Sequence, residues 1–206
     1  MSSTVSLALS GISLVVAVTT AWLTLWRRGT VCMAQPPSVY FGPDGARERH
    51  PKVFVRALLY ATSIRGRIVQ GMFVRLRRGD SSQTFPIWVS GDARGNLNRG
   101  AGLAVKSDGI ALHHHFLLPG DGTTYEFLPG AYELELCAVL VGQSRPHRLG
   151  LIKLAVSDLE AARLREDQTS GLYFDWSPDT GCYSTHIDQA KLPEPPPTTV
   201  TLTPRP

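Results

Sequence analysis

Residues 127–141 read FLPGAYELELCAVLV, and this stretch decides the fold. From Tyr132 onward the apolar side chains recur at every second position, which is the period of a β-strand with one buried face. The Pro-Gly pair before it is typical of a turn. The stretch therefore predicts a turn that leads into a half-buried strand. The predicted inward side chains are Tyr132, Leu134, Leu136, Ala138 and Leu140, and the predicted outward ones are Glu133, Glu135 and Cys137.

The start of this strand resembles the corner before the penultimate strand of immunoglobulin-like and fibronectin type III-like β-sandwiches. In that corner a tyrosine hydroxyl bonds back to the preceding turn. The resemblance implies that Pro129, Gly130 and Tyr132 form a structural corner, with Tyr132 in the core. It covers about ten residues, and the cysteine pair and core tryptophan of antibody domains are absent. It therefore concerns the fold and not the activity.

Six further segments have strand-like composition and are separated by Gly, Pro and Asp turns. They are Ser38–Phe41, Lys52–Ala61, Met72–Arg78, Thr84–Val89, Gly109–Leu118 and Leu149–Val156. Within the fourth of these, Phe85, Ile87 and Val89 are expected to share one face. This spacing predicts a mainly β protein, with an antiparallel immunoglobulin-like sandwich over residues 51–157.

Residues 1–26 carry no charged side chain, and residues 5–26 are predominantly apolar. At about 1.5 Å of rise per residue, that length matches a hydrocarbon core of about 30 Å. We therefore predict a short flank over residues 1–4 and a single transmembrane helix over residues 5–26. Indole rings and arginines favour the headgroup region. The predicted membrane-anchoring residues are Trp22, Trp26, Arg27 and Arg28.

Small side chains recur at every fourth position of this helix, at Ser13, Ala17 and Ala21. Such spacing permits close helix–helix contact, so weak self-association through the helix is also expected.

Basic residues follow the apolar segment, and none precedes it. The positive-inside rule then predicts the inner (cytoplasmic) membrane as the location, with the C-terminal domain in the cytoplasm. Residues 27–78 hold 11 basic and 2 acidic residues, a net of +9, whereas residues 79–206 carry a net of −5. We expect the basic juxtamembrane linker, residues 27–50, to lie near anionic lipid headgroups. Nucleic acid is not expected as a partner, because no recognisable binding motif surrounds the arginines.

After the sandwich, the sequence predicts a helix that begins at Ser157 or Asp158, with acidic residues in its first turn. A β-hairpin with a Pro-Asp turn follows, and the two together form an expected extension over residues 158–192. The Pro-rich tail, residues 193–206, is expected to be disordered.

The run His113-His114-His115 is the strongest candidate for chemistry. On a strand, His113 and His115 share a face, as two metal ligands would. A metal site needs a third ligand, and the later histidines and acids do not fit a known spacing. The competing interpretation is that His114 packs inward. No cofactor is expected, since no phosphate-binding or nucleophile motif is present.

Two function classes follow. The favoured one is a single-pass membrane-anchored protein whose cytoplasmic sandwich is a protein-interaction or scaffolding module for an unidentified protein partner. The alternative is a metal-binding protein or metal-dependent enzyme built on His113 and His115.

Overall fold

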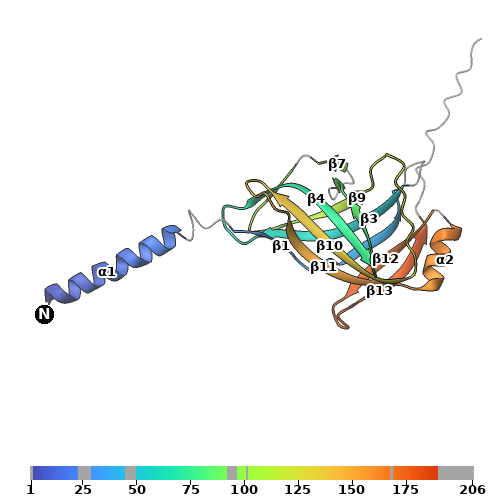
Figure 1. The fold of residues 1–206 in the computed structure, drawn as a ribbon. Coiled ribbons are helices and arrows are strands. Elements are labelled where there is room, and N and C mark those ends of the chain that lie inside the picture. Colours follow the sequence, from blue (N-terminus) through green and yellow to red (C-terminus); the bar gives the residue numbers. More distant parts are fainter. Residues whose placement is uncertain are drawn as a thin grey trace, which may run out of the picture.

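The computed structural model describes residues 2–22, 29–44, 50–91, 97–100, 102–167 and 169–189. Two antiparallel sheets pack face to face, so the chain is a mainly β sandwich, as predicted (Figure 1). Two helices accompany the sheets, α1 (Ser2–Ala21) and α2 (Asp158–Glu166). Helix α2 lies at one end of the sandwich (Figure 1).

The larger sheet has eight strands. They are β1 (Val31–Met33), β2 (Ser38–Pro43), β3 (Pro51–Ala61), β6 (Ile87–Gly91), β7 (Leu97–Arg99), β9 (Ile110–Leu117), β12 (Ser170–Ser177) and β13 (Cys182–Gln189). Their spatial order is β13-β12-β2-β3-β9-β6-β7, and β1 pairs with β3.

The smaller sheet has five strands. They are β4 (Arg67–Arg78), β5 (Ser81–Phe85), β8 (Leu103–Val105), β10 (Gly130–Leu140) and β11 (His147–Val156). Their spatial order is β11-β10-β4-β5, and β8 pairs with β4.

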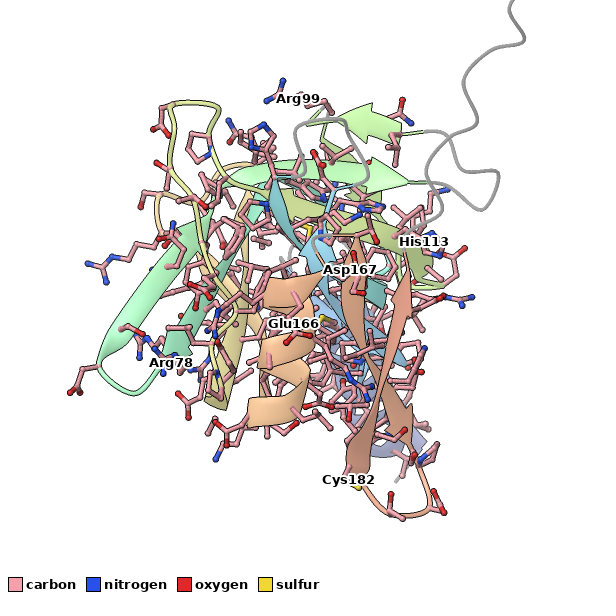
Figure 2. All side chains as sticks on the ribbon, turned by 90° about the vertical axis from the view of Figure 1, so that its right-hand side faces the viewer. Arg78, Arg99, His113, Glu166, Asp167 and Cys182 are labelled. Carbon is pink, nitrogen blue, oxygen red and sulfur yellow. The ribbon has the colours of Figure 1, made fainter. Side chains whose placement is uncertain are left out.

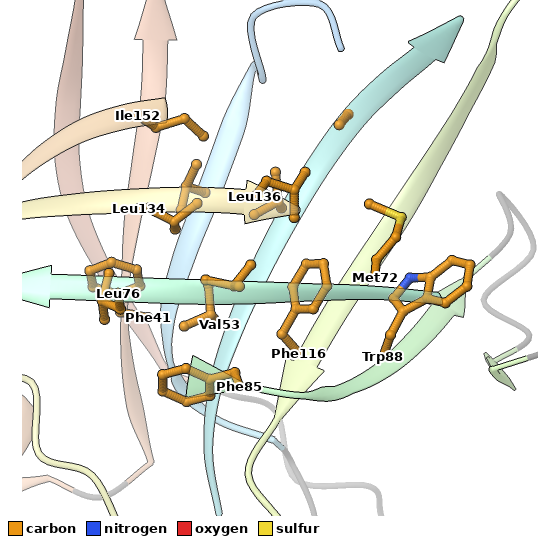
Figure 3. Packing of buried hydrophobic residues seen from close by; sticks show 14 of the residues in the cluster. Phe41, Val53, Met72, Leu76, Phe85, Trp88, Phe116, Leu134, Leu136 and Ile152 are labelled. Carbon is orange, nitrogen blue, oxygen red and sulfur yellow. The ribbon is translucent and has the colours of Figure 1, made fainter. Parts of the chain in front are cut away.

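The core lies between the two sheets and is built from alternate positions of the strands (Figure 3). The five predicted inward side chains of β10 are all buried there. Cys137 is buried as well, although its position faces outward. Its register with β11 shifts at this point, and its cross-strand partners are Phe73 and Arg148. Side chains of the neighbouring strands thus cover the thiol.

The predicted strand over residues 84–89 is wrong, because the chain changes sheets in the middle of it. Phe85 ends β5 in the smaller sheet, and Ile87 begins β6 in the larger one. Pro86 lies between them, and proline cannot donate a ladder hydrogen bond. The crossing shifts the alternation by one residue, so Phe85 and Trp88 point into the core, while Ile87 and Val89 do not.

The sandwich also extends beyond the predicted boundaries of residues 51–157. Strand β1 comes from the expected linker. Strand β2 confirms the predicted strand Ser38–Phe41, which lies outside those boundaries, and its Val39 and Phe41 are fully buried. The expected C-terminal hairpin is β12 and β13, and β12 pairs with β2. The hairpin therefore enlarges one sheet of the sandwich.

Helix α2 begins where the sequence predicts. Ser157 is its N-cap, the Ser157 side chain accepts a hydrogen bond from the Glu160 backbone N–H, and the Glu160 carboxylate accepts one from the Ser157 backbone N–H. This reciprocal pair is a capping box.

Helix α1 ends at Ala21, and eight of its 20 residues are serine or threonine. Within residues 2–22 and the other described ranges, no helix is both long enough and apolar enough to cross a membrane. The predicted transmembrane span over residues 5–26 is therefore not supported. Trp22 is exposed, and Trp26, Arg27 and Arg28 lie outside the described residues.

Candidate functional site

The three consecutive histidines lie on β9, where their side chains alternate between the two faces of the larger sheet. His114 is fully buried on the inner face. His113 and His115 share the outer face (Figure 2 labels His113). Both rings lie against Phe54 of the neighbouring strand, with ring centroids 5.4 Å and 5.0 Å from that of Phe54. An aromatic ring thus occupies the space beside the predicted metal ligands.

The described part of the chain contains no group of three or more His, Cys, Asp or Glu side chains that could hold a metal ion. The positive charge of Lys52 near His115 opposes a cation as well. Burial, with the nearby Lys52 charge as the second cause, lowers the pKa of His115 to about 4. The same ammonium group would repel a bound cation. Among the residues that the structure describes, His113 and His115 therefore have no third ligand of the kind that the metal hypothesis requires.

The outer face of the larger sheet instead carries an aromatic row, which no single stretch of sequence reveals. Its members are His186 (β13), Tyr173 (β12), Tyr40 (β2), Phe54 (β3) and His115 (β9). Each is the direct cross-strand partner of the next. Register alone therefore brings five aromatic side chains from five adjacent strands into one line.

Ring contacts join Tyr40, Tyr173 and His186 on one side of the aromatic row, and Phe54 and His115 on the other. His186 stacks on Tyr173, with centroids 5.1 Å apart and planes at 7°. The centroids of Tyr40 and Tyr173 are 4.7 Å apart. Tyr40 lies across Gly42 and Gly171, where a Cβ would overlap its ring. Its hydroxyl donates a hydrogen bond to the Pro43 carbonyl oxygen at 3.2 Å. The row is thus held in place by packing and by the two glycines.

Charged side chains of both signs lie beside the aromatic row. At the β13 end, the Asp175 carboxylate lies 3.1 Å from His186 Nδ1, and Asp188 is on the same strand as His186. Toward β9, the Lys52 ammonium lies 5.2 Å from the centre of the Tyr40 ring. Arg56 and Arg99 are exposed on β3 and β7. Asp44 acts on both Lys52 and Tyr40, so the row is not divided into an acidic side and a basic side.

A cleft of about 570 Å³ lies at the α2 end of the sandwich. Its apolar lining includes Tyr125, Phe127 and Leu164. Its charged lining consists, among the described residues, of Glu126 and Arg165, which form an ion pair with each other. Because these charges neutralise one another, the cleft presents no charge to a ligand, and it is a weaker candidate than the aromatic row.

The predicted corner residues lie together at the start of β10. The Tyr132 hydroxyl donates a hydrogen bond of 2.6 Å to the Leu128 carbonyl oxygen, and the Tyr132 ring is buried against Phe41. Gly130 has a φ of 136°, a backbone conformation that favours glycine. This hydrogen bond is the one that the Pro-Gly-x-Tyr pattern predicts, and its role is structural.

The described basic residues of the segment 50–78 are not gathered on one face. Arg75 forms an ion pair with Glu135 at 2.7 Å on the smaller sheet. Arg78 donates a hydrogen bond to the Pro129 carbonyl oxygen near the α2 end (Figure 2). Arg65 and Arg67 lie at the start of β4, the opposite end of the same strand. The charge split in the sequence is therefore not a division of the surface.

The sequence pattern predicts that His113 and His115 share a face, but it does not reveal Tyr40, Phe54 and Tyr173 as members of the same row. A local signal for two of them existed. Tyr40 and Phe54 occupy the outward positions of alternating strands, where aromatic side chains would not be needed for the core. Their alignment with His115 depends on the spatial order of β2, β3 and β9, and alternation of apolar residues does not predict that order.

No protein-family model and no curated protein matches the chain. Among solved structures it is similar to a family 123 glycoside hydrolase from Clostridium perfringens, described for glycolipid glycan hydrolysis. The two are 8% identical with a TM-score of 0.30, over 63% of this chain and 27% of the hydrolase. The chain thus spans about a quarter of that protein, and a similarity this weak carries no inference about activity.

Proposed function

We propose that this protein is a bilayer-attached interaction module whose sandwich binds a protein partner through the aromatic row. The row is the observation that carries the proposal. Aromatic side chains supply large contact areas with few rotatable bonds, and they dominate the binding energy of many protein interfaces. His186 is exposed, Tyr173 and Phe54 are partly exposed, and Tyr40 is buried between Tyr173 and Phe54.

The charges beside the row indicate what the partner should present. Arg56 and Arg99 favour a partner with carboxylates opposite β3 and β7. The rings favour an apolar or aromatic side chain over the middle of the row. The partner is therefore a protein surface that combines an apolar anchor with an acidic flank.

Attachment to the bilayer rests on α1. Its large apolar side chains are all more than half exposed, and an exposed apolar surface of this kind is typical of a protein or membrane interaction site. These side chains are Val5, Leu7, Leu9, Ile12, Leu14, Val15, Val16 and Val18, and Trp22 directly after α1 is more than half exposed as well. We infer that α1 attaches the chain to the inner membrane, with the sandwich on the cytoplasmic side, where Arg27 and Arg28 favour it.

The corner at the start of β10, formed by Pro129, Gly130 and Tyr132, bears on the fold family. We infer a distant relation to immunoglobulin-like sandwiches, supported by the Tyr132–Leu128 hydrogen bond.

The interaction is tested by a photo-crosslinking amino acid placed in the full chain at Tyr173. Leu151 on the smaller sheet is the matched control, because its side chain is exposed on a strand far from the row. A partner should crosslink from position 173 and not from position 151.

The crosslinked protein must then bind the purified full chain directly. Tyr173→Ala should raise its Kd about tenfold or more, equivalent to about 1.4 kcal/mol, whereas Leu151→Ala should leave it unchanged. Equal crosslinking from both positions, or a Kd that Tyr173→Ala does not alter, would contradict the proposed surface.

Attachment is tested separately by flotation of the full chain with lipid vesicles. Leu14→Asp with Val15→Asp should abolish flotation, because burying two charges in lipid is costly. Leu159→Asp, an exposed leucine on α2, is the control and should float normally. A reporter fused after Pro206 that becomes active only on export would contradict the cytoplasmic orientation.

A further inference from the structure

One end of the sandwich, here called the entry end, receives the chain after α1. Gly29 lies against Ser63, and the Thr30 backbone N–H donates a hydrogen bond of 2.8 Å to the Thr62 hydroxyl. The Thr62 backbone N–H donates one of 2.9 Å back to the Thr30 carbonyl oxygen. The first described residues after α1 are therefore fixed to the turn between β3 and β4, residues 62–66.

Two more turns lie at the entry end. The turn between β10 and β11, residues 141–146, is placed by a hydrogen bond from the Val141 N–H to the Ile68 carbonyl oxygen. The turn after β8, residues 106–109, is placed by a hydrogen bond from the Ala61 N–H to the Lys106 carbonyl oxygen. The entry end and the α2 end are thus the two opposite ends of the sandwich (Figure 1).

The entry end exposes apolar side chains that the sandwich does not need. Ile64 is 78% exposed, Ile68 55% and Val141 52%. Ile68 and Val141 lie beside each other over a shallow hollow of about 410 Å³. Exposed apolar side chains in turns and at the strand ends beside them indicate a contact surface.

Basic side chains surround this apolar group. Arg65, Arg67 and Lys106 line the hollow, and Arg145 is exposed on the adjacent turn. On these turns the described acidic residue is Asp108, so the entry end is strongly positive. Apolar tips within a ring of basic groups match the two layers of a membrane surface, acyl chains beneath and anionic headgroups around them.

We propose that the entry end docks on a bilayer that contains anionic lipid. Ile64, Ile68 and Val141 enter the interface, and the basic side chains contact headgroup phosphates. The proposal rests on the attachment of α1, which holds the entry end near the membrane through Gly29 and Thr30. When the entry end is docked, the outer face of the larger sheet, which carries the aromatic row, does not face the membrane. The row therefore remains accessible to a cytoplasmic partner.

Hydrogen exchange of the full chain bound to vesicles tests the docking. In phosphatidylcholine vesicles that contain phosphatidylserine, amides of residues 62–66 and 141–146 should exchange at least about fivefold more slowly than in pure phosphatidylcholine. High salt should reverse the protection, because exposed charges are screened. The turn between β12 and β13 should exchange equally in both lipids.

Two double variants with the same net charge distinguish docking through the entry end from a general attraction between a basic protein and anionic lipid. Arg65→Glu with Lys106→Glu should remove the protection. Arg77→Glu with Arg163→Glu makes the same change in net charge at the other end of β4 and on α2, and it should retain the protection.

The outcomes separate this proposal from the attachment itself. A chain that fails to float with either vesicle would contradict the role of α1. A chain that floats but shows equal exchange in both lipids, or protection that survives Arg65→Glu with Lys106→Glu, would overturn docking. Protection of the same turns by an RNA oligonucleotide and not by phosphatidylserine would overturn it too.

Discussion

The indole Nε1–H of Trp88 donates a hydrogen bond of 3.2 Å to Nδ1 of His114 in the interior of the sandwich. Because Nδ1 accepts, the proton of the neutral imidazole resides on Nε2. Nε2 is buried and has no hydrogen-bond partner among the described residues. A second proton on this ring would put a charge in the core, so burial lowers the pKa of His114 to about 4.

This lowered pKa makes the stability of the sandwich depend on pH. The unfolded chain binds a proton at this histidine below about pH 6.5, whereas the folded chain does so only below about pH 4. Above pH 6.5, His114 is therefore neutral in both states and does not lower the free energy of unfolding. Between pH 6.5 and pH 4 it should lower the free energy of unfolding progressively, by about 3 kcal/mol in total. Urea unfolding at a series of pH values measures this slope.

Two variants isolate the contribution of His114 from that of His115, whose pKa is also lowered. Trp88→Phe removes the indole donor and keeps the imidazole, so the pH slope should persist. Trp88→Phe with His114→Leu replaces both polar groups by apolar ones. The pH dependence of the free energy of unfolding should then decrease by the part that His114 contributes. Identical slopes in the two variants would show that His114 is not buried in neutral form.

A second prediction concerns the corner. Tyr132→Phe leaves the Leu128 carbonyl without its hydroxyl donor and should lower the free energy of unfolding by about 1–3 kcal/mol. Tyr132→Ala should cost about 3–5 kcal/mol, because it also empties a core position. Tyr60→Phe, at an exposed tyrosine on β3, is the control and should change stability by less than about 0.5 kcal/mol. Chemical denaturation gives all three values.

Alternation predicted β3, β10 and β11 well, because each is long and has one face in the core. Alternation did not predict the strands correctly where the chain crosses between sheets or where a strand is very short. Pro86 transfers the chain from one sheet to the other, and a strand signal on both sides of it hides the crossing. Strands β1, β7 and β8 have three residues each, too few to display a period.

The local sequence pattern does not predict the aromatic row, and the reason is different. Tyr40 and Phe54 are close in sequence, but His115, Tyr173 and His186 come from strands far along the chain. Only the spatial order of the strands and their register align them. The same holds for the entry end, where three turns from distant segments meet.

The cap of α2 provides a third prediction. Ser157→Ala should lower stability by about 1 kcal/mol, the usual cost of losing an N-cap. Because Ser157 and Glu160 act as one reciprocal pair, Ser157→Ala with Glu160→Ala should cost less than the sum of the two single changes. Additive losses in urea unfolding would show that the capping box does not act as a unit.

The last prediction tests whether packing against glycine holds the aromatic row in place. A Cβ at Gly171 would overlap the ring of Tyr40, which is itself buried. Gly171→Ala should therefore destabilise the sandwich by about 1–3 kcal/mol, the range for overpacking. In a Tyr40→Ala background the overlap is gone, so the same substitution should cost less than about 0.5 kcal/mol. Gly120→Ala is the control, because nothing lies near its Cβ position and the substitution should be neutral or slightly stabilising. An equal cost of Gly171→Ala with and without Tyr40 would mean that backbone conformation, and not the ring, requires glycine there.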